Sequence, residues 1–236
     1  MKRLLTILGL LGAASVSPLI FPIAEAGHSS MDVLAIYALL PAMAVTIILI
    51  WLLHRFNDSW AKQALVGLGA GAIATIGLEV IRIAGFRLGF MPGNLPRLIG
   101  VLLLNQFSTG PTLTSDIAGW GYHFWNGASF GLIYVLLLGT CRRWAGVLFG
   151  IFIGLGFMLG PVVSSLGVGF LGLAFSKGFP VTVMLAHLAF GGILGWLTAR
   201  WLGFLESSLL EALADSVRTC LPRHHPAQSP RLHKPL

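Results

Sequence analysis

Five apolar stretches, each about as long as a membrane-spanning helix, follow an apolar amino terminus. They run approximately over residues 33–53, 63–83, 115–138, 144–163 and 181–202. A helix needs about 20 apolar residues to cross the hydrocarbon core of a bilayer. Because backbone polar groups in lipid must be hydrogen-bonded within the protein, the chain is predicted to be all-α, a polytopic transmembrane helix bundle.

The scarcity of charge supports this class. Only 10 % of the 236 residues are charged, against about a quarter in an ordinary soluble domain. Apolar residues make up 56 %, and the mean hydropathy is +0.86. This composition excludes a soluble enzyme, a disordered chain and a typical nucleic-acid-binding protein. We therefore expect the lipid bilayer as the partner and no nucleic acid.

The amino terminus has the pattern of a secretory signal peptide. Lys2-Arg3 precedes an apolar run from Leu4 to about Ile23, and Ala24-Glu25-Ala26 has the small-x-small form of a cleavage site. We therefore predict a signal peptide over residues 1–26, which leaves five spans in the mature protein. The alternative is an uncleaved first membrane helix, which makes six.

Basic residues predict the orientation. They lie at 54–62, at Arg142-Arg143 and after the last span, in alternate breaks between the apolar stretches. Because Lys and Arg collect in cytoplasmic loops, the mature amino terminus is predicted to be external and the carboxyl terminus cytoplasmic, in a bacterial inner membrane. Residues 27–204 form the predicted bundle, and residues 205–236 a cytoplasmic amphipathic helix and disordered tail.

The segment 84–114 departs from this rule, because it is predicted to be external yet carries Arg87 and Arg97. Its apolar run Leu98–Leu104 is too short to span. We interpret it as an interfacial or re-entrant segment packed against the bundle. The alternative is that the run does span, so that the topology after it inverts.

Pairs of glycines four residues apart place small faces on four of the five predicted spans. Such faces let helix backbones approach closely in lipid. They can serve packing within one chain or a homo-oligomer. The glycines are Gly67 and Gly71, Gly127 and Gly131, Gly146, Gly150 and Gly154, Gly156 and Gly160, and Gly191 and Gly195.

A few polar residues remain inside the predicted spans, where such groups are functional candidates. Glu79 and Arg82 are three apart, so they share a helix face as a predicted structural ion pair. The rise per helical residue places four side chains in one layer in the outer third of the bilayer. These are Glu79, His123, His187 and Met158.

This layer predicts a transition-metal site. Two histidines and a carboxylate suit a divalent metal, and methionine favours copper. The predicted function is metal handling, with copper first, by a transporter or accessory factor with no catalytic residues. The predicted ligands are Glu79, His123, His187, Met158 and Met184, with His28 and Met31 at an external entrance.

Other functions stay open for the same layer. A histidine from each of two helices could hold haem. Glu79, Arg82 and the histidines could form a proton or solute pathway. The chain could also be a non-catalytic membrane scaffold or assembly partner, with histidines that only hydrogen-bond between helices. The chain contains none of the HExxH, CxxC and P-loop motifs that would favour an enzyme.

A polar and aromatic patch surrounds His123. It is either part of the site or an aromatic belt at the membrane interface. Its members are Asp116, Trp120, Tyr122, Trp125 and Asn126.

Three stretches, Gly93–Arg97, His123–Gly131 and Ala186–Gly191, resemble uncharacterised multi-pass bacterial inner-membrane proteins. The resemblance extends over about residues 63–200. It implies a compact bundle with a histidine in each of two helices. It implies no activity, cofactor or catalytic residue.

Overall fold

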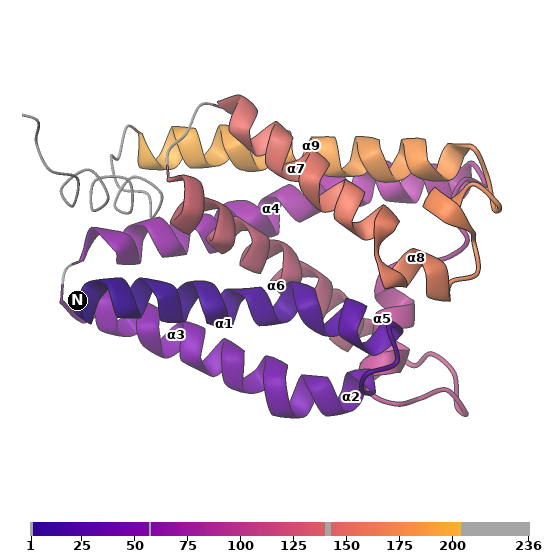
Figure 1. Ribbon diagram of the computed structural model, residues 1–236, viewed down its shortest axis with the longest axis horizontal. Coiled ribbons are helices and arrows are strands. Elements are labelled where there is room, and N and C mark those ends of the chain that lie inside the picture. The colour runs from indigo at the N-terminus through magenta and orange to yellow at the C-terminus, as the bar shows by residue number, and fades with distance from the viewer. Residues whose placement is uncertain (1, 57, 140–142, 204–236) are drawn as a thin grey trace, which may run out of the picture.

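The computed structural model describes residues 2–56, 58–139 and 143–203, and in these ranges the regular elements are helices (Figure 1). The predicted all-α bundle is therefore confirmed. The amphipathic helix and tail predicted over 205–236 lie outside the described residues. The longer helices are α1 (Lys2–Glu25), α3 (Leu40–Arg55), α4 (Ser59–Arg87), α6 (Leu113–Leu138), α7 (Arg143–Leu159) and α9 (Gly178–Leu202). Shorter elements are α2 (Met31–Leu34), the π-helical η1 (Ala35–Leu39), α5 (Leu95–Leu103), α8 (Pro161–Ser165) and the 3-10 helix η2 (Phe170–Gly172).

Five of the described helices are long and apolar enough to cross a membrane. They differ in two respects from the five predicted mature spans, because the set includes the amino-terminal helix and leaves out α6. Although α6 has 26 residues, Asp116, His123 and Asn126 interrupt its apolar sequence. The five helices are Leu4–Glu25, Met31–Arg55, Ser59–Arg87, Trp144–Ser165 and Gly178–Leu202.

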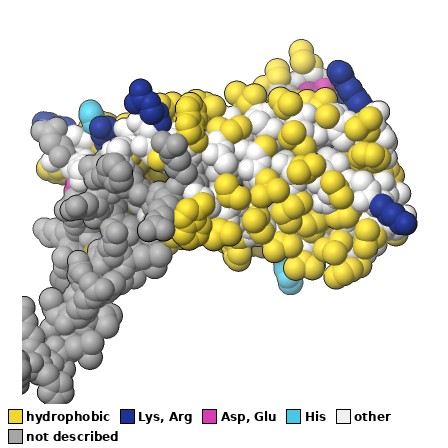
Figure 2. All heavy atoms as spheres, turned by 90° about the horizontal axis from the view of Figure 1, so that it is seen from above, with side chains coloured by type: hydrophobic (Ala, Val, Ile, Leu, Met, Phe, Trp, Pro, Cys, Tyr) yellow, Lys and Arg dark blue, Asp and Glu magenta, His cyan; other side chains and the backbone are white. Residues whose placement is uncertain are grey.

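The long helices run in alternating directions along one axis (Figure 1). One end of the bundle carries the start of α1, the α3–α4 connection and the end of α9, and the opposite end carries α5 and α8. We call the second the α5 end. Figure 2 shows hydrophobic side chains over much of the surface between these ends, with Lys and Arg gathered near them. This surface suits contact with lipid.

Glycines hold two pairs of helices in close contact. On α4 and α6, a Cβ at Gly67 would lie 2.8 Å from the carbonyl oxygen of Gly131. On α7 and α9, a Cβ at Gly146 would lie 2.7 Å from the Cα of Gly195. These predicted small faces therefore serve packing within one chain.

The α1 helix is part of the core. Leu10, Ala14, Ser17 and Ile20 recur every three or four residues, and all four are buried. The helix packs against α3 and α6, and also contacts α8. The segment predicted to be a signal peptide thus forms one side of the bundle.

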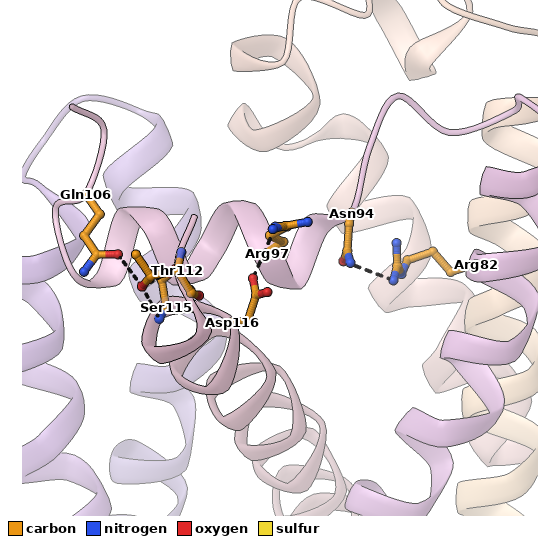
Figure 3. A network of polar contacts seen from close by, with 7 residues as sticks. All are labelled: Arg82, Asn94, Arg97, Gln106, Thr112, Ser115 and Asp116. Atoms are coloured by element: carbon orange, nitrogen blue, oxygen red, sulfur yellow. Dashed lines mark hydrogen bonds and ion pairs between the residues drawn. The ribbon is translucent and has the colours of Figure 1, made fainter. Parts of the chain in front are cut away.

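The segment between α4 and α6 is tied to both helices by polar contacts (Figure 3). Asn94 precedes α5 and accepts a hydrogen bond from Arg82 on α4, at 3.5 Å. Arg97 on α5 lies 3.4 Å from the carboxylate of Asp116 on α6. With nine residues, α5 is about 13 Å long, too short to cross a bilayer. It lies across one end of the bundle (Figure 1), and the interfacial or re-entrant position of segment 84–114 stays a prediction.

The start of α6 is fixed by its own cap. Thr112 and Ser115 form a capping box, in which each side chain accepts a hydrogen bond from the other residue's backbone N–H. The hydroxyl of Thr112 also donates to Gln106, at 2.9 Å (Figure 3). These bonds set where α6 begins, and hence the level at which its polar side chains lie.

Candidate functional site

Glu79 and Arg82 form a buried ion pair on α4. Arg82 donates from Nε to Oε1 and Oε2 of Glu79, at 2.7 and 2.9 Å, and its Nη2 donates to Oε2. The residues are only 4 % and 5 % exposed. Buried charges of this kind persist when they are paired, and here one carboxylate neutralises one guanidinium.

His123 brings α6 to this pair. Its Nε2 lies 2.9 Å from Oε1 of Glu79, which is ion-pair distance, but it has no hydrogen-bond partner in the part of the chain described. The imidazole also meets Trp120 edge to face, with ring centroids 6.2 Å apart.

His187 on α9 is held in one orientation. Its Nδ1 lies 2.8 Å from the carbonyl oxygen of Val183, and its ring stacks on Phe157 with centroids 6.2 Å apart. Because a carbonyl can only accept, Nδ1 must carry the proton of this bond. In the neutral ring, Nε2 is then left with a lone pair.

Both histidines line one cavity of about 450 Å³ inside the bundle. Its wall is mostly apolar, with Phe130, Phe157 and Phe190 among its aromatic members. A mostly apolar cavity with a few convergent polar groups is the usual form of a small-molecule site. Its polar lining residues are Ser15, Thr75, Arg82, Tyr122, His123, Asn126, Thr182 and His187.

The cavity opens sideways. Leu19 on α1 and Phe152 on α7 both line it, and they are 54 % and 75 % exposed. Such exposed apolar side chains belong to the surface that would contact lipid. The cavity therefore has a mouth between α1 and α7, on the lipid-facing side of the bundle.

Two members of the predicted polar-aromatic patch attach α1 to α6. The hydroxyl of Tyr122 donates to the carbonyl oxygen of Ser17, at 2.7 Å. The hydroxyl of Ser17 in turn donates to Oδ1 of Asn126, at 3.2 Å. Trp125 packs against the apolar cluster to which Tyr122 also belongs. The patch therefore has several structural roles in addition to its contact with the cavity.

The predicted methionine ligands lie elsewhere. Met158 and Met184 belong to an apolar cluster beside the cavity and do not line it. Met31 is only 2 % exposed and packs in another cluster, whereas His28 is exposed beyond the end of α1. The two residues predicted at an external entrance are thus in different environments.

The described residues contain no group of three or more His, Cys, Asp and Glu that could hold a metal ion. The structure brings Glu79 to His123, and places His123 and His187 on one cavity. Sequence reasoning missed Met91, which lines this cavity from the segment after α4. Its position in a turn-rich connection gave no helical register from which to place it.

No family model, curated protein or solved structure matches this chain. The functional argument therefore rests on the geometry of the cavity and its polar groups.

Proposed function

We propose that this protein binds an apolar or amphiphilic small molecule within the membrane, for transport or transfer. The observation that carries the proposal is the cavity of about 450 Å³, which combines apolar walls with convergent polar groups. A pocket of this size and composition suits a ligand that dissolves in lipid and is oriented by a few hydrogen bonds. The mouth between Leu19 and Phe152 supports access from the bilayer.

The orientation and location predicted from the basic residues complete the proposal. The protein lies in a bacterial inner membrane, with the α5 end external and the end that carries the α3–α4 connection cytoplasmic. The basic residues His54, Arg55 and Lys62 near that connection support this orientation. The cavity then lies in the outer part of the bilayer.

Filling the cavity should abolish binding. Gly156 is an exposed residue that lines the cavity, and a Cβ there would meet no atom within 4 Å, so a larger side chain can be placed at the cavity wall. The probe is a diazirine-bearing dodecane, photolysed with the protein in lipid nanodiscs. Wild type should give labelling of cavity peptides that saturates and is competed by dodecane, and Gly156→Phe should lose it.

The matched control is Gly192→Phe on α9. Gly192 also has no atom within 4 Å of its Cβ position, but it is not among the residues that line the cavity. This variant should keep the saturable labelling. Labelling that never saturates, or that is equal in wild type and Gly156→Phe, would disprove binding in the cavity.

Copper handling is the second proposal, and the environment of the two histidines favours it. Metal-bound histidines usually direct their second ring nitrogen to a carboxylate or a backbone carbonyl. His123 directs Nε2 to Glu79, and His187 directs Nδ1 to Val183. Glu79 would then orient a ligand rather than be one. Met91 is a thioether on the same cavity.

The copper proposal predicts stoichiometric copper in the purified wild-type protein and its loss from the double variant His123→Ala/His187→Ala. Elemental analysis of both proteins checks it. His54→Ala, which changes an exposed histidine near the opposite end of the bundle, should keep the metal. Negligible metal in the wild-type protein would exclude the copper proposal. The absorbance spectrum of the same preparation tests haem, because a colourless protein holds none.

A further inference from the structure

We propose that the ligand of this cavity has an uncharged head group that accepts one hydrogen bond and donates another, as an alcohol does. This inference rests on the proposed binding function and specifies the ligand class. It follows from three features of the site: the charge balance of Glu79 and Arg82, an acceptor on His187 and a donor on Asn126.

The charges of Glu79 and Arg82 cancel each other. Arg82 lines the cavity, but its guanidinium is occupied by the carboxylate of Glu79 through both Nε and Nη2. The pair has no net charge. A charged ligand head would therefore enter a mostly apolar cavity without a counter-ion, and burial of an unpaired charge is costly.

His187 supplies the acceptor. Its Nδ1–H is taken by the carbonyl of Val183, so the lone pair of the neutral ring is on Nε2. Among the described residues no carboxylate lies within ion-pair distance of His187 that would favour the charged ring. A ligand hydroxyl can donate to this nitrogen.

Asn126 supplies the donor. Its Oδ1 accepts the hydrogen bond from the hydroxyl of Ser17. The amide nitrogen has no partner in the part of the chain that the structure describes. An amide NH₂ can only donate, so it is complementary to an oxygen of the ligand head. Asn126 and His187 come from different helices, α6 and α9, and line the same cavity.

The test is competition against the diazirine-bearing dodecane in nanodiscs. The competitors are dodecanol, dodecyl sulfate and dodecyltrimethylammonium, compared at equal mole fraction in the bilayer. Because all three carry the same chain, only the head group differs. Dodecanol should compete at least about tenfold better than either charged compound. A tenfold difference corresponds to a cost of about 1.4 kcal/mol for burying the charged head group.

Two variants connect this preference to the named groups. In His187→Phe and in Asn126→Leu, dodecanol should compete only about as well as dodecane. Competition by dodecane itself should be the same as in wild type. Retained preference for dodecanol in both variants would overturn the assignment of donor and acceptor. Stronger competition by a charged compound would overturn the ligand class. Both outcomes leave cavity binding intact, whereas absence of saturable labelling would remove the proposed function itself.

Discussion

Replacing Glu79 by alanine is expected to destabilise the protein by about 3–5 kcal/mol, because it leaves a buried guanidinium without its counter-ion. Arg82 is 5 % exposed, and all three of its bonds to a charged partner go to Glu79. The remaining bond, to Asn94 at 3.5 Å, is long and neutral. Unfolding in mixed micelles titrated with dodecyl sulfate measures the loss.

Two further variants separate pairing from other effects. Glu79→Leu/Arg82→Met removes both charges and keeps the volume, so it should recover most of the lost stability. Asp116→Ala breaks the partly exposed pair with Arg97, in which the side chains are 32 % and 52 % accessible, and should cost less than about 1 kcal/mol. Equal losses for Glu79→Ala and Asp116→Ala would show that burial does not determine the cost.

Gly131→Val is expected to separate α4 from α6 and to cost about 1–3 kcal/mol or more. A Cβ at Gly131 would lie 2.7 Å from the Cα of Gly71, and that backbone cannot move aside without shifting the helix. The same micelle titration measures this loss. The close contact between α4 and α6 also places His123 next to Glu79. Labelling of the cavity should therefore decrease in Gly131→Val as well.

Gly121→Val is the matched control on the same helix. A Cβ at Gly121 meets nothing within 4 Å, and valine has a somewhat higher helix propensity than glycine, so this variant introduces no clash and no propensity cost. It should stay close to wild type. If the two variants were equally stable, the close approach at Gly131 would not contribute to packing.

Much of the fold could be predicted because lipid imposes simple rules. The lengths of the apolar stretches predicted the long helices, and the helix predicted over 63–83 extends from Ser59 to Arg87. The four-residue spacing of the glycines predicted which helix faces pack closely against each other. What the sequence left open was the environment of α6, whose polar residues Asn126, His123 and Asp116 contact α1, α4 and α5.

The candidate site was predicted only in part, for a geometric reason. Rise per residue gives the depth of a side chain but not the direction in which it points. Depth grouped Glu79, His123 and His187, and two of these meet directly. It also grouped Met158, which turns away from the cavity, and it could not show that α1 forms a wall.

The mouth between α1 and α7 has a consequence for how the proposed ligand would reach its site. A molecule that dissolves in the bilayer is concentrated there and meets the protein by diffusion in two dimensions. Occupancy would then follow the ligand's mole fraction in the membrane, while its concentration in water would matter only through partitioning. Lengthening the alkyl chain of a ligand should raise its apparent affinity measured from the aqueous phase, even if every contact inside the cavity stayed the same.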